Sequence, residues 1–270
     1  LFVKKSETQF SHSLAKDFLP ANRANIIDRN GHLLATNLKT RSLYAKPRLV
    51  SDPQKAANQL AQILPISDPS GLFKLLNQDR KFVWIRRHLT PKLQNRVNRL
   101  GLPGLNFRHG EKRVYPAGAL TAHLLGYTDT DNRGLAGIER HFDKDLRSRQ
   151  NALKLSVDIR VQQIVRSELE SAKTKFRAKG ASGVVMDVKN GEIIAMVSLP
   201  DFDPHFPTGL NTNAHFNRAT LGVYEMGSTF KIFTTAMALD SGKITLKGGY
   251  DAKRPIRIGK HIIRDYHPKN

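Results

Sequence analysis

Residues 181–198 read Ala-Ser-Gly-Val-Val-Met-Asp-Val-Lys-Asn-Gly-Glu-Ile-Ile-Ala-Met-Val-Ser. Two nearly continuous apolar runs are separated by Lys189-Asn-Gly191, and an Asn-Gly pair readily adopts the positive φ angles of a tight turn. The stretch therefore predicts a β-hairpin. Because both runs are apolar without alternation, we expect the hairpin to lie in the centre of a sheet.

A short strand and then a helix are predicted before this hairpin. Leu153-Lys-Leu-Ser-Val157 predicts a short strand, and Asp158 is a natural helix N-cap. The apolar residues that follow recur at helical spacing: Val161, Ile164, Val165 and Leu169. We expect a second domain to begin here, so that the chain divides into residues 1–150 and 151–270.

Another helix is predicted after the hairpin. A loop rich in Pro, Asp and Asn runs from Pro200 to Asn213. From Ser228 onward the apolar residues of one helical face are Phe230, Phe233, Met237 and Ala238. Ser241-Gly242 is expected to end this helix.

The first 150 residues alternate short strand and helix signals. Asn25–Ala35 predicts a hairpin around Asn30-Gly31, and Lys81–Arg87 predicts another strand. Helices are expected after Asp52-Pro53, with Pro65 as the stop, and after Thr90-Pro91. Arg113–Gly118 is expected to be extended. The mixture predicts an α+β domain that does not look enzymatic.

Composition limits the function classes. The 270 residues are 39% hydrophobic and 25% charged, which predicts packed globular domains. Disulfides and thiolate sites are excluded because there is no cysteine. The formal net charge of +21 is spread over both halves, and the basic clusters lack the aromatic residues of a base-stacking surface. We therefore expect a polyanionic environment and no nucleic acid as partner.

Motifs for metals, nucleotides and membrane spans are missing from the sequence. The histidines form no H-E-x-x-H pattern, and His261 and His267 do not suggest a metal pair. The glycines form neither G-x-G-x-x-G nor a Walker A loop. No apolar run approaches the ~18–20 residues that cross a bilayer. We expect no metal and no cofactor.

Ser228-Thr-Phe-Lys231 is an S-x-x-K tetrad, whose first and last residues share one face of a helix. A lysine can take the proton of a nucleophilic serine only as the neutral amine, which burial and nearby positive charge favour. The tetrad alone is common, and Ser13-Leu-Ala-Lys16 is a second match. Ser228 has the better context, because Gly227 allows a sharp turn into a helix whose N-terminus favours a developing anion.

The chain around this tetrad closely resembles the class B penicillin-binding proteins, the monofunctional peptidoglycan D,D-transpeptidases. In the second half the matching stretches are Leu153–Gln162, Ser182–Pro204, Asn217–Ala219 and Tyr224–Lys231. In the first half they are Arg23–Gly31, Arg113–Gly118, His123–Gly126 and Gly134–Asp143, which are similar to the signature segments of the N-terminal pedestal. The resemblance covers nearly the whole chain in order. Tyr224–Ser228 and Gly134–Arg140 are more similar to the division-specific, FtsI-type branch than to the elongation branch.

The resemblance implies a fold and an activity. The fold would be an α+β pedestal, residues 1–150, followed by an α/β transpeptidase domain of helices around an antiparallel sheet, of which residues 151–270 are an incomplete part. Ser228 would be the nucleophile and Lys231 the general base of peptidoglycan cross-linking. The implied ligands are D-Ala-D-Ala stem peptides and β-lactam antibiotics. The implied setting is septal wall synthesis with other membrane proteins of cell division, in a periplasmic protein anchored to the inner membrane by one span upstream of residue 1.

The chain also departs from the family pattern. Ala24 stands where glycine is usual, Met226 where proline is common and His205 where asparagine is usual. The family's S-x-N and K-[ST]-G motifs occur nowhere in the sequence, and both normally lie well downstream of S-x-x-K. We therefore expect the chain to be the front portion of a longer protein and, taken alone, to be inactive.

Two other functions fit parts of the sequence. A non-catalytic scaffold for cell-wall machinery would make Ser228 incidental, and a β-lactamase or β-lactam sensor would share S-x-x-K but would not need the pedestal segments. Arg23 and Glu139 are interpreted as an ion-pair network that holds the pedestal together. Asp187 is interpreted as a hydrogen-bonded turn carboxylate.

Overall fold

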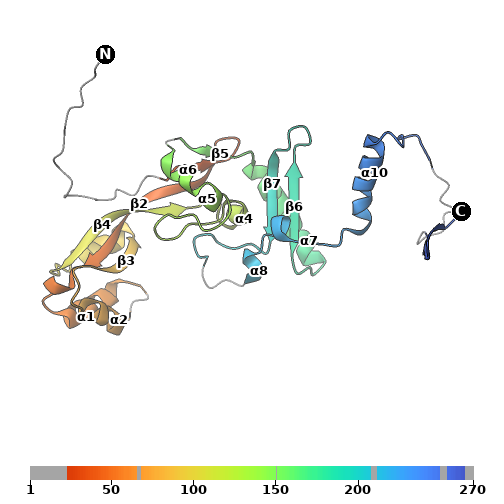
Figure 1. Cartoon of the computed structure of the whole chain (residues 1–270). Helices are drawn as coiled ribbons and strands as arrows, with labels where there is room; N and C mark the ends of the chain where they lie inside the picture. Colours follow the sequence, from red (N-terminus) through yellow and green to blue (C-terminus); the bar gives the residue numbers. More distant parts are fainter. Residues whose placement is uncertain (1–22, 66–67, 150, 208–211, 250–253, 265–270) are drawn as a thin grey trace, which may run out of the picture. The chain divides into compact units, whose positions relative to one another are not determined.

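The structure is a computed structural model that describes residues 23–65, 68–149, 151–207, 212–249 and 254–264 (Figure 1). The chain forms two compact units, residues 1–222 and 223–270. The division of the chain into domains at residue 150 stays a prediction, because these units reflect packing and not domain ancestry.

The first unit is built on a mixed sheet with the strand order β3-β2-β1-β5, and β4 also pairs with β2. The strands are β1 (Ile26–Ile27), β2 (Leu33–Ala45), β3 (Val83–Leu89), β4 (Leu105–Val114) and β5 (Leu153–Lys154). The long strand β2 pairs antiparallel with β1, β3 and β4, whereas β5 pairs parallel with β1. The predicted hairpin at 25–35 and the strand after Lys81 are confirmed.

Three helices pack on the β2–β3–β4 part of the sheet: α1 (Pro53–Ile63), α2 (Pro69–Leu76) and α3 (Pro91–Asn98). Each begins with proline, whose missing N–H costs nothing at a helix start, after a residue that caps the helix. The caps are Asp52, Asp68 and Thr90. Leu43, Leu60 and Val83 lie in the core between helices and sheet. The helices at 53 and 91 are confirmed, whereas α2 was not predicted.

A second hydrophobic cluster surrounds the β1 end of the sheet, with Ile26, Leu34, Leu125 and Leu146 fully buried. The short helices near it are α4 (Ala122–Leu125), α5 (Gly137–His141) and α6 (Asp143–Ser148). Two 3₁₀ turns lie at Pro47–Leu49 and Gly118–Thr121. Leu153 of β5 belongs to this cluster, so the predicted start of the second domain is packed into the core of the first.

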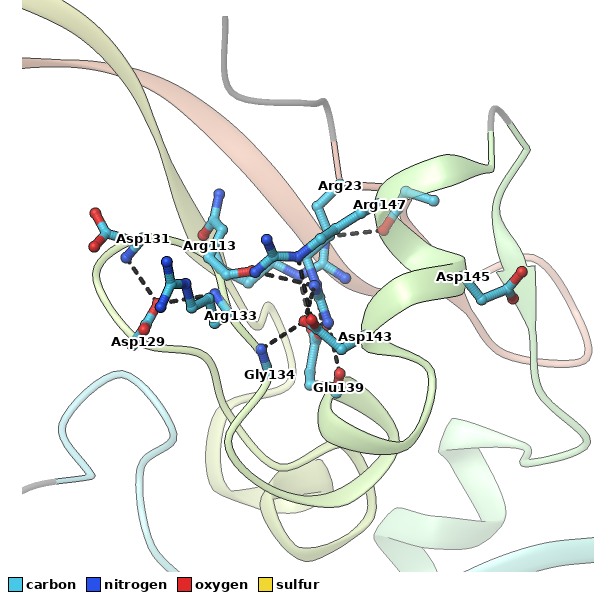
Figure 2. A network of polar contacts seen from close by, with 12 residues as sticks. Arg23, Arg113, Asp129, Asp131, Arg133, Gly134, Glu139, Asp143, Asp145 and Arg147 are labelled. Atoms are coloured by element: carbon cyan, nitrogen blue, oxygen red, sulfur yellow. Dashed lines mark hydrogen bonds and ion pairs between the residues drawn. The ribbon is translucent and has the colours of Figure 1, made fainter. Parts of the chain in front are cut away.

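An ion network lies beside this cluster, with the Glu139 carboxylate at its centre (Figure 2). Glu139 is fully buried and accepts hydrogen bonds from Nε of Arg23 at 2.6 Å and from Nε of Arg113 at 2.7 Å. Arg23 also reaches Asp143 at 2.7 Å. The predicted role of Arg23 and Glu139 is confirmed, and Arg113 and Asp143 are partners that the sequence reasoning did not name.

The predicted hairpin is β6 (Ala181–Met186) and β7 (Ile193–Leu199), paired antiparallel. Among the described residues it forms a two-stranded sheet, so its expected place in the centre of a larger sheet stays a prediction. Val184 and Met186 lie on one face of β6 and are 48% and 52% exposed, and Val185 on the opposite face is 37% exposed. The end of β6 thus has exposed apolar side chains on both faces.

The helix α7 (Ile159–Lys175) packs against this hairpin, and Asp158 caps it as predicted. The buried side chain is Gln162, whose amide donates to the carbonyl of Met196 and whose oxygen accepts from the Met196 N–H. Of the four apolar residues that recur at helical spacing, Val161, Val165 and Leu169 are partly buried and Ile164 is 62% exposed. The helix thus meets β7 through a polar side chain that satisfies backbone groups of the strand.

Both hairpin turns follow the same local rule. Gly31 and Gly191 have positive φ angles of 88° and 77°, whereas the asparagine before each does not. An aspartate opens each turn and accepts backbone hydrogen bonds: Asp28 from Asn30 and His32, and Asp187 from Lys189. Asp187 is therefore the turn carboxylate that the sequence indicated.

Asp28 also ties the first hairpin to the start of α7, because its Oδ2 accepts the backbone N–H of Ile159 at 3.2 Å. Burial tends to raise the pKa of Asp28, but the hydrogen bonds from the His32 ring and from the backbone of His32, Ile159 and Asn30 outweigh it and lower the pKa to about 2. The ionised form is therefore the stabilising one.

We predict that Asp28→Asn lowers the free energy of unfolding by about 2 kcal/mol at neutral pH. An aspartate in the unfolded chain titrates near 4, so this stabilisation is complete above that pH and is lost as the pH falls towards 2. Urea unfolding of both proteins at several pH values measures the difference.

The matched control is Asp187→Asn, which removes a turn carboxylate with one backbone hydrogen bond and should cost less than about 1 kcal/mol. A difference between wild type and Asp28→Asn that stays constant down to pH 3 would contradict the assigned role of the Asp28 charge.

Candidate active site

The S-x-x-K tetrad lies in the second unit, at the start of its main helix. A 3₁₀ turn (Gly227–Phe230) runs directly into α10 (Lys231–Asp240). Gly227 has φ of 53°, a conformation that side chains with a Cβ rarely adopt, and so allows the abrupt entry into the turn. The predicted helix and its end before Gly242 are confirmed.

Ser228 and Lys231 are one 3₁₀ turn apart. The backbone N–H of Lys231 donates to the carbonyl oxygens of Ser228 and Thr229. In a 3₁₀ turn residues i and i+3 are eclipsed, so the serine and lysine side chains leave the backbone on one side. The hydroxyl of Thr235 donates to the Lys231 carbonyl at 2.9 Å and joins the first turn of α10 to the next. The sequence reasoning did not single out Thr235.

Both reacting side chains are exposed in the described part of the chain. No hydrogen bond of the Ser228 hydroxyl or of the Lys231 ammonium group is found among the described residues. The roles of nucleophile and general base are therefore supported by residue type and spacing, and they stay predictions at the level of side-chain geometry.

The helix that carries the tetrad exposes a large apolar surface. The exposed side chains are Phe230, Ile232, Phe233 and Met237, at 59–68%. The ring centroids of Phe230 and Phe233 lie 5.6 Å apart. A helix with apolar side chains on more than one face is normally buried. The walls of an active site around Ser228 are thus not supplied by the described residues of this unit.

The described residues of the second unit also form a short hairpin of β8 (Ile256–Ile258) and β9 (His261–Ile263), paired antiparallel. Of the two histidines considered for metal binding, His261 lies in β9, while His267 lies outside the described residues. The alternative tetrad Ser13–Lys16 also lies outside them.

The residues that the structure describes contain neither a candidate metal site nor a candidate membrane span. Within them, no three His, Asp or Glu side chains converge in a way that could hold a metal ion. None of the helices in the described ranges combines the length and the apolar composition that a bilayer crossing requires.

Serine and lysine one turn apart are suited to acyl transfer. The serine hydroxyl can attack a carbonyl carbon once its proton is taken, and a neutral lysine amine can take that proton. Stabilising the resulting oxyanion needs two preorganised donors. The start of α10 could offer one such N–H, and the other has to come from elsewhere in the protein.

Two family models match the chain. Residues 18–175 match the penicillin-binding protein dimerisation domain, and residues 181–270 match the penicillin-binding protein transpeptidase domain. Among curated proteins, the chain is 40% identical to a probable peptidoglycan D,D-transpeptidase FtsI of Caulobacter vibrioides over 91% of its length. It is 30% identical to the peptidoglycan D,D-transpeptidase FtsI of Escherichia coli K12 over 98% of its length. It spans 42% and 50% of these two relatives, about half of their length.

Two solved structures share the fold. The chain superimposes on a penicillin-binding protein from Helicobacter pylori, solved as a complex with MreC, with a TM-score of 0.70 and 23% identity over 93% of this chain and 57% of that one. A peptidoglycan synthetase from Bifidobacterium adolescentis gives a TM-score of 0.63 at 20% identity, with 93% of this chain and 55% of that chain covered. The expected order of a mixed α+β domain and a transpeptidase domain is confirmed.

Proposed function

The chain belongs to the class B penicillin-binding proteins, with their dimerisation and transpeptidase domains, and from this we propose that the protein containing it cross-links peptidoglycan by serine acyl transfer. The observation that carries the proposal is the S-x-x-K tetrad at a 3₁₀ entry to a helix, inside the segment that matches the transpeptidase domain. No cofactor is needed for this chemistry.

Ser228 would attack the carbonyl carbon of the penultimate D-alanine of a stem peptide, while the neutral amine of Lys231 takes the hydroxyl proton. The peptide bond to the terminal D-alanine breaks, the leaving amine receives a proton, and an ester forms on Ser228. An amine of a neighbouring stem then attacks this ester and restores the serine. A β-lactam would acylate Ser228 in the same way and leave an ester on the serine that hydrolyses slowly.

The exposed apolar side chains of α10 support this proposal. Phe230, Phe233 and Met237 beside the tetrad would be covered in a complete transpeptidase domain, and that covering would exclude water from the surroundings of Ser228 and Lys231. The S-x-N and K-[ST]-G motifs of the family would come from the same further part of the transpeptidase domain.

The two rival functions fit less of the molecule. A β-lactamase or β-lactam sensor would not need residues 18–175, which match a dimerisation domain. A scaffold without catalysis would not need the serine and lysine at this spacing in the transpeptidase segment. Both rivals are excluded if Ser228 is acylated and cross-linking depends on it.

The cellular setting is part of the proposal. Both curated relatives described above are named FtsI, and we infer a role in septal wall synthesis for a periplasmic protein with one inner-membrane anchor. Other membrane proteins of the division machinery would be its partners. The formal net charge of +21 suits an environment of anionic wall polymers and lipids.

We predict that a fluorescent penicillin labels Ser228 in the full-length protein and that Ser228→Ala abolishes the labelling. Lys231→Ala should slow acylation by about 10²–10⁴-fold without unfolding the protein, because a proton acceptor is lost. Labelling kinetics on gels, with circular dichroism as the folding check, measure both effects.

Ser13→Ala is the matched control, since it removes the serine of the other S-x-x-K tetrad and should leave labelling unchanged. Labelling that survives Ser228→Ala would refute the assignment of the nucleophile.

We also predict that depletion of the protein in its host gives filamentous cells with unfinished septa, as seen by fluorescence microscopy. Rounded cells would instead assign the protein to the elongation branch of the family.

A further inference from the structure

A histidine ring makes a hydrogen bond between the loop after β7 and the end of β4. The loop, residues 200–207, belongs to the segment that matches the transpeptidase domain, whereas β4 belongs to the segment that matches the dimerisation domain. Nε2 of His205 accepts the backbone N–H of Tyr115, directly after β4, at 3.0 Å. This contact therefore joins the two matched segments.

The contacts of the His205 ring assign its hydrogen to Nδ1. A neutral imidazole has one donor nitrogen and one acceptor nitrogen. Nε2 is the acceptor, because the N–H of Tyr115 points at it. Nδ1 lies 2.7 Å from Oδ1 of Asp203, and a carboxylate oxygen accepts hydrogen bonds. The structure therefore requires the neutral Nδ1–H form of the ring.

A second proton on the ring is incompatible with the contact to Tyr115. In an imidazolium both nitrogens are donors, so that an N–H of His205 would face the N–H of Tyr115. Tyr115 is 2% exposed, and its backbone N–H has no direct access to water as a replacement acceptor. A buried N–H without an acceptor is costly. The hydrogen bond between loop and β4 therefore exists only with neutral His205.

Asp203 favours the protonated ring without holding the loop on β4. It lies in the same loop, two residues before His205, and also accepts the backbone N–H of His205 at 2.9 Å. Burial tends to raise the pKa of Asp203, but the hydrogen bonds from the backbone and the ring of His205 outweigh it and lower the pKa. The carboxylate is therefore ionised where histidines titrate, between about pH 5 and 8. Its contact with Nδ1 persists in the imidazolium and stays inside the loop.

The other ionisable groups near the ring carry charges of both signs. His205 lines a cavity of about 500 Å³, whose further ionisable side chains are His88, Lys112, Arg113, Tyr115 and Asp129. The two cations oppose a positive charge on His205, and the carboxylate of Asp129 favours it. Burial raises the pKa of the Tyr115 hydroxyl, which stays neutral. Burial and the charge of Arg87 lower the pKa of His88, which favours its neutral form.

We propose that protonation of His205 breaks its hydrogen bond to Tyr115, so that acid loosens the loop 200–207 from β4. The hydrogen bond contributes stability at pH values above the titration of the imidazole, and this contribution is lost as the pH falls through it. The pedestal and the transpeptidase segment are thus joined more tightly at neutral pH than in acid. This switch lies in the first unit and does not rest on the proposed acyl-transfer chemistry.

The test uses the full chain with ¹⁵N-labelled tyrosine and histidine, observed by NMR between about pH 8 and about pH 5. At the higher pH, the imidazole signals of His205 should show hydrogen on Nδ1 and none on Nε2. At the lower pH, the protection of the Tyr115 amide against hydrogen exchange should be at least about tenfold smaller, after correction for the intrinsic exchange rate. Tyr44, which pairs with both β3 and β4, should keep its protection and is the internal reference.

The decisive variant is His205→Gln, whose side-chain oxygen can replace Nε2 as the acceptor but does not titrate in this range. Its Tyr115 amide should stay protected at both pH values. His109→Asn is the matched control, at an exposed histidine of β4, and should keep the pH dependence of wild type.

Three results would overturn the proposal: a hydrogen on Nε2 of neutral His205, constant protection of Tyr115 in wild type, or an equal fall in His205→Gln. The first of these is read from wild type alone and does not depend on how well glutamine fits.

Discussion

The buried carboxylate of Glu139 between Arg23 and Arg113 is the interaction on which the first unit depends. Removing these charges from water is costly. Their attraction compensates because the contacts are short and because other donors of the two arginines reach Asp143 and backbone carbonyls. The partners come from the segment before β1, from the end of β4 and from α5, and Arg23 and Glu139 are 116 residues apart in the sequence. The network therefore stabilises one arrangement of these segments.

A series of polar contacts extends from this network towards the transpeptidase segment. β1 pairs with β5, Asp28 in the adjoining turn binds the N-terminus of α7, and Gln162 of α7 binds β7. Each contact satisfies backbone groups that would otherwise be buried without partners. Hydrophobic burial supplies most of the folding free energy, whereas these polar contacts select the register in which the segments meet. The hairpin of the second half is thereby fixed to the sheet of the first.

Local features were predictable from the sequence and long-range partners mostly were not. Capping residues such as Asp52 and Asp158 mark helix starts by their own chemistry, and the Asn-Gly pairs mark the two turns. The helical spacing of the apolar residues in α7 did not reveal that the helix meets β7 through Gln162 or that Ile164 is exposed. The roles proposed for Ser228 and Lys231 rest on spacing and family resemblance alone, since both side chains are exposed in the described part of the chain. The three-helix packing on β2 depends on distant contacts that no local pattern encodes.

The central claim is that the Glu139 network, and not surface charge, holds the first unit together. The direct measurement is the free energy of urea unfolding of Glu139→Gln beside Glu192→Gln, which removes the half-exposed ion pair with Arg29. We predict that the free energy of unfolding falls by about 3–5 kcal/mol in Glu139→Gln, because two buried guanidinium groups lose the carboxylate charge that they share. In Glu192→Gln it should fall by less than about 1 kcal/mol. Equal losses in the two variants would contradict it.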